Sequence, residues 1–364
     1  MSTSLKAPPA IGVDIGGTKM AVAAVDRQGT RLAQTTLPTE ASLGFDRAVS
    51  RLIEAICAVA AQAGGSPDDL RGIGIGCAGP VDPAHGLINN PYTLTGWDRC
   101  DIVSPLRGRF GVPVWLENDA DAALLGECFA GAGRGLDPVV LLTFGTGIGG
   151  AAMVRGALYR GANGEHPELG HIPVLPEGPA CYCGHRGCLE SLASGTALSD
   201  AGRPHGWEDA RAVFAAADGG AAAAQEIVDR SLKAAALAAW TLFHTFLPQR
   251  LLLGGGMMAD HYDRFAAAMN RRLAPATQFT RAAVSIARAQ LGNDAGVVGA
   301  AARGWVRSWP DSVMGGVGAG PAAGIVKPIG ALGRTLMLPS AWPTGWSGVI
   351  EKAQSGRLWL PASN

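Results

Sequence analysis

The sequence predicts an α/β protein built from two domains with a ligand cleft between them. At 364 residues the chain exceeds a typical single domain, so two units could each bury a core. Apolar strand-like runs alternate with helical stretches along most of the chain, a pattern typical of the α/β class. Glycine-rich hairpins at residues 11–25 and 139–159 are of the same kind, which suggests two similar halves.

Charge and hydropathy exclude some classes of partner. The 30 basic and 30 acidic side chains cancel, which removes the electrostatic argument for nucleic acid or an anionic membrane and favours a small polar ligand. The first residues lack the apolar run of a signal peptide, and no stretch approaches the roughly 20 apolar residues of a membrane span. We therefore expect a cytoplasmic protein that binds neither nucleic acid nor membrane.

The first half of the chain predicts a strand-rich unit. Residues 11–25, "IGVDIGGTKMAVAAV", indicate a strand, a tight turn and a returning strand, and residues 31–38 a third strand. Apolar residues recur at helical spacing over 46–63, and "LRGIGIGCAGPV" at 70–81 predicts a buried strand that ends in a glycine-rich loop. The order is strand, helix, strand.

The next strand ends in a polar junction. A short apolar run stops at Glu117, and Asn118 or Asp119 could then begin a helix. Polar side chains are thus predicted at the end of a strand.

The second half repeats this organisation. The hairpin at 139–159 precedes alanine-rich helices within 208–247, then a buried strand that opens into three glycines, "RLLLGGGMM", and more helix. We expect a first domain over 1–118, completed by a helix near 294–303, and a second over 119–293. The extension 304–364 is rich in Gly, Pro and Trp and shows no clean period; its tryptophans favour packing onto the main body over disorder or an independent site.

Seven cysteines divide into two groups. The scattered ones are expected to be reduced packing residues: Cys57, Cys77, Cys100 and Cys128. The others form H-x9-C-x-C-x4-C, a standard tetrahedral zinc set: His171, Cys181, Cys183 and Cys188. Four protein ligands leave no open position, so the zinc is expected to be structural. Unrelated buried cysteines and a redox dithiol are weaker alternatives, and His185 is either a surface residue or a substitute ligand.

The glycine turns predict phosphate binding. In the first, backbone amides of glycine and adjacent polar side chains follow a strand-end carboxylate: Asp14, Gly16, Gly17, Thr18 and Lys19. In the second the corresponding residues are Gly145, Thr146 and Gly147. Two such turns imply a nucleoside triphosphate held between the domains.

Taken in order, several motifs resemble those of the ROK family of bacterial sugar kinases, within the actin and hexokinase-like superfamily. The resemblance spans roughly residues 10–302 and is carried by "DIGGTK", "ENDADAALLGE", "FGTGIGG", "ELGH", "CYCGHRGCLE" and "LLLGGGM". It implies a two-domain actin/hexokinase-like (ribonuclease H-like) ATPase fold that closes on ATP and a hexose and transfers the γ-phosphoryl group to the sugar 6-hydroxyl. It also places Gly254, Gly255 and Gly256 near the adenosine, and suggests a homo-oligomer, a dimer or a tetramer.

A sugar hydroxyl is a poor nucleophile, so a carboxylate must accept its proton. Asp119 is the candidate base, the alternative being a helix N-cap. Neighbouring Asn118 is expected to bind sugar hydroxyls, or else to serve only in the turn. Gly79 in the "CAGP" turn and, more weakly, Asn90 and Thr93 would complete the pocket.

In the family, the residues matching Glu168, His171 and Glu190 hydrogen-bond the far end of the sugar ring. One imidazole nitrogen of His171 could bind zinc while the other donates to the sugar. Glu168 and Glu190 could instead be solvated surface acids. Mg²⁺ is implied by the charge of the transferred phosphoryl group, with Asp14 the nearest protein carboxylate, acting through water.

The substrate stays open between several sugars. The "ELGH" motif favours glucose, with N-acetylmannosamine, mannose and fructose as alternatives, and Pro167 stands where a small residue commonly precedes the glutamate, which could alter the 2-substituent tolerated. The family also contains sugar-binding transcriptional repressors, but no basic recognition helix precedes Asp14 here. A sugar-binding regulator without catalysis is the alternative from another class.

Overall fold

The computed structural model describes residues 7–161, 164–278 and 284–306, all within one unit, Met1–Met314. A second unit, Gly315–Asn364, lies outside the described residues, together with almost all of the Gly/Pro/Trp-rich extension. One tryptophan of that extension, Trp305, is described, and its indole N–H donates to the carbonyl of Val25 at 3.0 Å. The expected packing of residues 307–364 onto the main body therefore stays a prediction.

The first sheet has the strand order β3-β2-β1-β4-β8. Its strands are β1 (Ala10–Ile15), β2 (Lys19–Val25), β3 (Arg31–Pro38), β4 (Gly72–Cys77) and β8 (Val114–Asn118). β1, β2 and β3 are antiparallel neighbours, as the hairpin pattern predicted, whereas β1, β4 and β8 run parallel. The register pairs Ile15 with Cys77 and Cys77 with Asn118, so three strands end together at one edge of the sheet.

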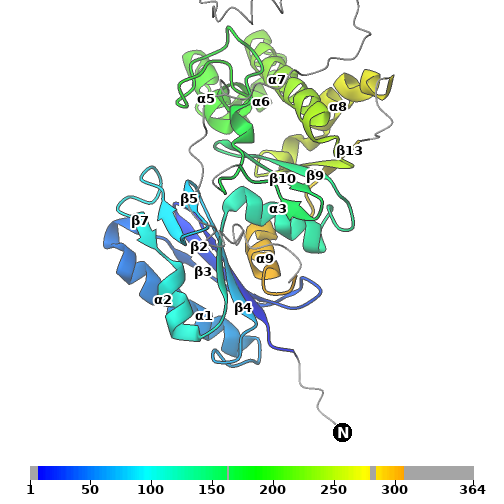
Figure 1. Cartoon of the computed structure of the whole chain (residues 1–364). Helices are drawn as coiled ribbons and strands as arrows, with labels where there is room; N and C mark the ends of the chain where they lie inside the picture. The colour runs from blue at the N-terminus through cyan, green and yellow to red at the C-terminus, as the bar shows by residue number, and fades with distance from the viewer. Residues whose placement is uncertain (1–6, 162–163, 279–283, 307–364) are drawn as a thin grey trace, which may run out of the picture. The chain divides into compact units, whose positions relative to one another are not determined.

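The two faces of this sheet are covered by different helices, because successive side chains of a strand point to opposite sides. Ile11, Val13 and Ile15 belong to the core that contains the apolar stripe of α1 (Phe45–Gln62), whereas Gly12 lies against α9 (Ala295–Ala302). Figure 1 shows α1 and α2 (Val103–Phe110) on one side of the sheet and α9 on the other.

A small antiparallel sheet lies between β4 and α2 in the chain. It consists of β5 (Val81–Asp82), β6 (Leu87–Asn89) and β7 (Asp98–Asp101). The loop between its last two strands packs Trp97 into the first core, where Trp97 is 1 % exposed.

The second sheet has the order β11-β10-β9-β12-β13. Its strands are β9 (Val139–Phe144), β10 (Ile148–Val154), β11 (Ala157–Leu158), β12 (Arg250–Gly254) and β13 (Ser285–Arg288). β9 and β10 form the predicted hairpin, and β12 runs parallel to β9. The sheets thus share their central arrangement, in which an antiparallel hairpin lies beside a parallel strand.

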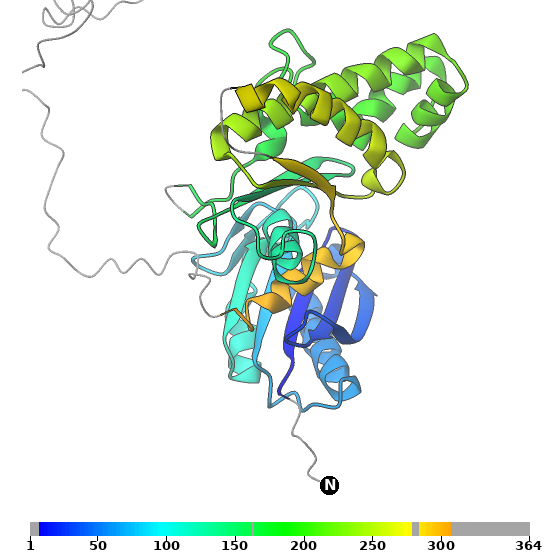
Figure 2. The same ribbon diagram turned by 90° about the vertical axis from the view of Figure 1, so that its right-hand side faces the viewer.

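Helices cover both faces of the second sheet as well (Figure 2). Val140, Leu142 and Phe144 pack with α7 (Ala222–Phe246) and α8 (Met258–Leu273), whereas the alternate residues of β9 pack with α3 (Asp119–Ala130). The remaining helical segments are α4 (Glu190–Ala193), α5 (Gly195–Gly202), α6 (Ala210–Asp218), η1 (Ala41–Leu43), η2 (Leu169–His171), η3 (Arg203–His205), η4 (Ala274–Gln278) and η5 (Gly292–Asp294). Within the ranges described, no helix combines the length and the apolar character that crossing a membrane needs.

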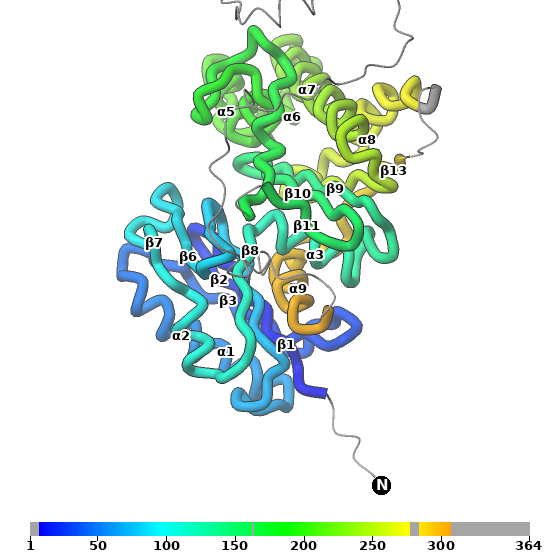
Figure 3. Tube along the Cα trace, in the orientation of Figure 1, coloured from blue at the N-terminus to red at the C-terminus, as the bar shows by residue number. Residues whose placement is uncertain are grey.

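Close backbone contacts join α9 to the first sheet and to α3. A Cβ atom on Gly12 would lie 1.8 Å from the carbonyl oxygen of Val297, and one on Gly74 would lie 1.8 Å from that of Ala300. On the opposite side of α9, a Cβ atom on Gly299 would lie 1.7 Å from the carbonyl oxygen of Ala122 in α3. The tube in Figure 3 shows α9 beside β1 and α3, although α9 lies almost 300 residues after β1 in the chain. Glycine is required at these positions because the backbones touch.

Replacing Gly299 with alanine should separate α9 from α3. Because the new methyl group would overlap α3 backbone atoms rather than a flexible side chain, we expect the free energy of unfolding to fall by about 1–3 kcal/mol or more. The matched control is Gly108→Ala in α2, where a Cβ atom meets nothing within 4 Å. Thermal unfolding followed by circular dichroism should show a lower melting temperature for G299A and not for G108A. An unchanged melting temperature for G299A would contradict this account of the contact.

Candidate functional site

The first glycine turn connects β1 to β2 at the edge where the parallel strands end. The backbone N–H of Gly16 donates to the carbonyl of Lys19 at 2.9 Å, and the residues between them, Gly17 and Thr18, are exposed. Asp14 precedes the turn, and its carboxylate lies against the first turn of α9, since a Cβ atom on Gly296 would be 2.8 Å from Asp14 Oδ2. The turn therefore presents free backbone amides beside a carboxylate.

The second glycine turn connects β9 to β10. The N–H of Gly145 donates to the carbonyl of Gly147 at 2.9 Å, while the carbonyls of Gly145 and Thr146 accept from the N–H groups of Gly195 and Thr196 at 2.8 and 3.2 Å. The start of α5 thus holds this turn in place.

A cavity of about 740 Å³ lies beside the second turn. Its lining includes Gly145, Thr146, Arg211 and the stacked rings of Phe214 and His261, whose centroids are 3.6 Å apart. Pockets for cofactors and other small ligands commonly have volumes of roughly 300–1,000 Å³. A lining that combines aromatic rings with the backbone of a glycine turn suits a base and its phosphates.

The three glycines after β12 differ in their surroundings. Gly254 is the last residue of β12 and is buried, and Gly255 has a φ of 86° and is packed on the backbone of Phe144. Gly256 lines the cavity. All three glycines were expected to lie near an adenosine, and this fits Gly256 best. Gly254 is paired within the sheet, and Gly255 is packed against the backbone of Phe144 in the turn.

Asn118 and Asp119 lie where β8 passes into α3. Asn118 is the N-cap of α3, and its Oδ1 accepts from the N–H of Ala120 at 2.8 Å. Asp119 is the first residue of the helix, and its Oδ1 also accepts from the N–H of Ala120 at 2.8 Å, so Oδ2 is the oxygen that remains available. A Cβ atom on Gly79 would lie 2.7 Å from Asn118 Nδ2, which places the "CAGP" turn directly beside the asparagine amide.

Asp14 and Asp119 belong to one electrostatic site. Burial, then the negative charge of Asp119, raises the pKa of Asp14 to about 6, although Lys19 acts in the opposite direction. Asp119 is itself open to solvent, yet the protein around its carboxyl group still displaces enough water to raise its pKa. The N–H of Ala120 and the charge of His166 oppose that rise. Because the two negative charges repel each other, a cation bound between them would make it easier for both carboxyl groups to ionise.

Asn90 has a role within its own loop. Its amide group donates to the carbonyl of Ala78 at 3.0 Å and to Thr93 Oγ1 at 2.7 Å, and its Oδ1 accepts from the N–H groups of Tyr92 and Thr93, both at 3.0 Å. These bonds use both N–H groups and both acceptor positions of the Asn90 amide. The side chain that was expected to bind sugar hydroxyls is therefore already paired within the protein. Thr93 is exposed and lies against Gly17, so the loop that Asn90 holds reaches the first glycine turn.

His171, Cys181, Cys183 and Cys188 come together as the spacing predicted. One donor atom from each lies within 4.8 Å of every other, with 3.4 Å between His171 Nδ1 and Cys181 Sγ and 3.6 Å between Cys183 Sγ and Cys188 Sγ. Three thiols and an imidazole at these separations fit a tetrahedral zinc ion. Gly184 and Gly187 have φ values of 91° and 65°, the left-handed conformation that lets the loop fold back on itself.

Glu168, His171 and Glu190 border this cluster. Glu190, the first residue of α4, accepts a hydrogen bond from the N–H of Ile148 at 2.6 Å and so connects the cluster with the second glycine turn. Glu168 is 59 % exposed, and its Oε1 lies 3.2 Å from His166 Nε2. The third residue, His171, directs Nδ1 toward the thiols and Nε2 away from them.

Tyr182 is the hydrogen-bond partner of the second ring nitrogen of His171. Its hydroxyl lies 3.1 Å from His171 Nε2, and the side chain is 83 % exposed. The sequence analysis did not single out this tyrosine, because a residue between two predicted metal ligands carries no signal of its own.

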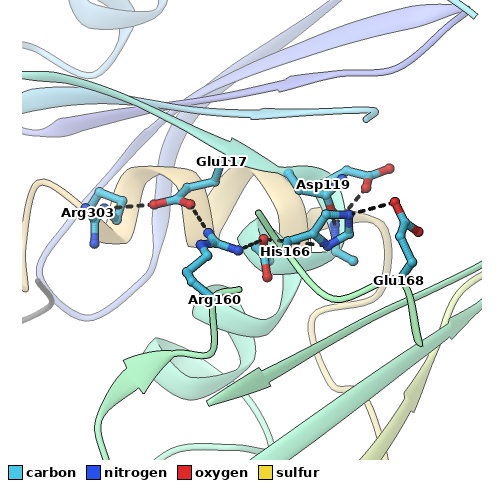
Figure 4. Close-up of polar contacts among 9 residues, drawn as sticks. Glu117, Asp119, Arg160, His166, Glu168 and Arg303 are labelled. Atoms are coloured by element: carbon cyan, nitrogen blue, oxygen red, sulfur yellow. Dashed lines mark hydrogen bonds and ion pairs between the residues drawn. The ribbon is translucent and has the colours of Figure 1, made fainter. Parts of the chain in front are cut away.

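A buried network of charged side chains lies behind Asp119 (Figure 4). Arg160 forms ion pairs with Glu117 at the end of β8 and with Asp121 in α3, and both carboxylates are essentially inaccessible to solvent. Arg303, just after α9, lies 3.4 Å from the other oxygen of Glu117. His166 Nδ1 lies 3.8 Å from Asp121 Oδ2. Burial raises the pKa of Glu117 and of Asp121, and the arginines oppose the rise.

Sequence analysis did not predict this network. Glu117 and Asp121 were visible in "ENDAD" as acids near a strand end, but Arg160 is 43 and 39 residues away from them. No local spacing connects partners at that separation.

Comparison with known proteins identifies the family. Residues 10–305 match the ROK family, and the chain belongs to it. It is 38 % identical over 264 residues to the glucokinase of Thermotoga maritima, covering 68 % of this chain and 81 % of that protein. Identity is 33 % over 296 residues to the N-acetylmannosamine kinase of Citrobacter koseri, covering 80 % of this chain and 97 % of that protein.

A solved structure gives the same result. The ROK family glucokinase from Streptomyces griseus, in complex with glucose and AMPPNP, aligns with a TM-score of 0.64 at 30 % identity, over 80 % of this chain and 98 % of that one. The predicted family and the actin/hexokinase-like α/β fold class are thereby confirmed.

Replacing Arg160 with leucine should leave two buried carboxylates without their main partner. Loss of one member of a buried ion pair typically costs about 3–5 kcal/mol, and we expect a loss of that order at pH 8. Without Arg160, the pKa values of Glu117 and Asp121 rise further above their unfolded values. Protonation then relieves the loss at low pH, and the loss grows as pH rises through those pKa values.

Urea unfolding of R160L at pH 5 and pH 8 measures this dependence. Arg47→Leu, at an exposed position of α1, is the control and should show little loss at either pH. A loss that is the same at both pH values would contradict the assigned partners of Arg160.

Proposed function

We propose that this protein is an ATP-dependent hexose kinase that transfers the γ-phosphoryl group of ATP to the 6-hydroxyl of a sugar, with glucose as the first candidate. The observation that carries the proposal is the position of Asp119. This carboxylate begins α3, affects the charge state of Asp14 beside the first glycine turn, and is itself affected by Glu168 and His166 on the other side. A base that must lie between a phosphate and a sugar is expected at such a point.

Asp119 acts as the general base and accepts the proton of the attacking hydroxyl. Its raised pKa makes it a stronger base than an ordinary aspartate. Asn118, fixed by its capping bond, presents its amide beside Gly79, where it can donate to adjacent sugar hydroxyls. Glu168, His171 and Glu190 hold the far end of the ring.

The nucleotide occupies the cavity beside the second glycine turn. Backbone amides around Gly145, Thr146 and Gly147 hold its phosphates together with Gly16, Gly17, Thr18 and Lys19 of the first turn. Asp14 would hold Mg²⁺ through water, and the bound ion would neutralise the charge of the phosphates. The pKa of about 6 at Asp14 supports this assignment, since a cation favours the ionised form there.

Zinc has a structural role in this proposal. His171, Cys181, Cys183 and Cys188 would hold it with no position left for water, so it fixes the wall that carries Glu168, His171 and Glu190. In this structure the hydroxyl of Tyr182 takes the place at His171 Nε2 that a sugar hydroxyl would take.

N-acetylmannosamine kinase is the second candidate, favoured by the relative of that name that spans 80 % of this chain. Pro167 beside Glu168 bears on the choice, because it limits the backbone conformations that set the direction of that carboxylate. The expectations of a cytoplasmic location and of a dimer or tetramer stay predictions.

A coupled assay with ATP, Mg²⁺ and a panel of hexoses and N-acetylhexosamines tests the function. We expect Asp119→Asn to lower turnover by about 10²–10⁴-fold while sugar binding persists, because the amide cannot accept the proton. Turnover of the natural enzyme should fall as pH drops through the raised pKa of Asp119, since the base must be ionised. Asp46→Asn at the exposed start of α1 is the control. Full activity of D119N, or no phosphorylation of any sugar on the panel, would refute the proposal.

The metal assignment has a separate test. Cys188→Ser should reduce bound zinc well below one ion per chain, lower the melting temperature and raise KM for the sugar, because the far wall loses its fixed shape. Cys57→Ser, at a partly buried position of α1 away from the cluster, should keep the zinc. Metal analysis of the purified proteins measures this, and a full zinc complement in C188S would contradict the ligand set.

A further inference from the structure

His166 lies between the buried charged network and the proposed sugar site. Its side chain is 13 % exposed, with Nε2 at 3.2 Å from Glu168 Oε1 and Nδ1 at 3.8 Å from Asp121 Oδ2. Figure 4 shows the ring next to Asp119 and Glu168, with Arg160 to its left, below Glu117. The imidazole is therefore hydrogen-bonded to an exposed carboxylate and lies within ion-pair distance, but not hydrogen-bond distance, of a fully buried one.

The exposed carboxylate needs something to orient it. Glu168 precedes η2 but makes no capping hydrogen bond to it, and its side chain would sample several rotamers in solvent. The N–H donated by His166 Nε2 fixes one carboxylate oxygen and leaves the second for a ligand. This bond is also the largest cause of the lowered pKa of Glu168, so the acceptor is kept ionised.

The buried carboxylate acts on the ring through its charge. Asp121 lies 3.8 Å from Nδ1, too far for a hydrogen bond, and is held by Arg160, which also binds Glu117, so a negative charge fixed in place on α3 lies beside His166. Burial alone would lower the pKa of His166, but the bond to Glu168 and the charges of Asp121 and Glu168 outweigh it, while Arg160 opposes them. The net rise favours the imidazolium, whose Nε2 donates to Glu168, whereas Nδ1 has no hydrogen-bond partner among the described residues.

We propose that His166 is a positioning residue for sugar phosphorylation, holding the Glu168 carboxylate toward the sugar through Nε2 while the nearby charge of Asp121 attracts the imidazolium. The inference rests on the proposed function and deepens it. Its consequence for the sugar is indirect, because His166 acts through Glu168 and through the charge it presents to Asp119. The charged groups that face it are Asp119 and Asp121 on α3 and Arg160 and Glu168 on its own segment.

Three substitutions separate the two nitrogens. The amide of glutamine at position 166 lies near the place of Nε2, that of asparagine near the place of Nδ1, and leucine keeps the bulk without a donor. We expect His166→Leu and His166→Asn to raise KM for the sugar by about tenfold, the value of a hydrogen bond to a charged group, with KM for ATP unchanged. His166→Gln should restore most of the sugar affinity.

Two further readouts distinguish positioning from a general structural effect. In a Glu168→Gln background, H166L should change KM for the sugar by less than about twofold, because the partner through which it acts is altered. The imidazolium lowers the pKa of Asp119, so its loss in H166L should move the acid limb of turnover to higher pH. Melting temperature and zinc content report on folding.

The inference fails if H166L leaves KM for the sugar unchanged, if glutamine is no better than leucine, or if the effects of H166L and E168Q simply multiply. The natural protein is assayed alongside. If it phosphorylates no sugar, the proposed function fails and this inference with it. If the natural protein phosphorylates a sugar but the variants do not differ from it in KM for that sugar, only the role assigned to His166 is wrong.

Discussion

Backbone contact between α9 and its neighbours on both sides is the constraint on which the site depends. Gly12 and Gly74 let α9 lie directly on the first sheet, and Gly299 lets it lie directly on α3. Because Asp14 lies against the first turn of α9 and Asp119 is the first residue of α3, the contact between these two helices sets how far apart the two carboxylates are. A methyl group at any of the three glycines would therefore change the distance between the two carboxylates without altering either side chain chemically.

The charges of the site are arranged in two layers that differ in exposure. Near the surface, Asp119 and Glu168 face solvent, where a sugar, a phosphate and a magnesium ion are proposed to bind. Behind them, Glu117, Asp121 and Arg160 are paired and almost inaccessible. A buried pair contributes little net stability but is costly to break, so this layer acts to fix geometry. His166 lies between the layers, 3.2 Å from Glu168 in the first and 3.8 Å from Asp121 in the second.

Local spacing predicted the parts of the site whose members lie close together in the chain. The metal ligands Cys181, Cys183 and Cys188 lie within one loop, so their spacing alone indicated a common ion. The hairpins were recognisable for a similar reason, because alternation and a glycine pair are properties of a few consecutive residues. Asn118 and Asp119 were also located correctly at a strand end, although deciding which of them caps α3 required the folded backbone, in which Asn118 is extended and Asp119 is the first helical residue.

The sequence by itself determined the family, the two hairpins with several of the strands and helices that follow them, and the set of donors around the cysteine cluster. Tertiary structure decided which of their side chains are buried and which contact one another. It buried Gly254 within a strand and left Gly256 on the cavity, engaged Asn90 within its own loop, and brought Arg160 to acids some 40 residues earlier. The reason is physical: propensity and periodicity act over one turn or one strand, whereas burial and charge pairing depend on which surfaces meet after the chain has folded.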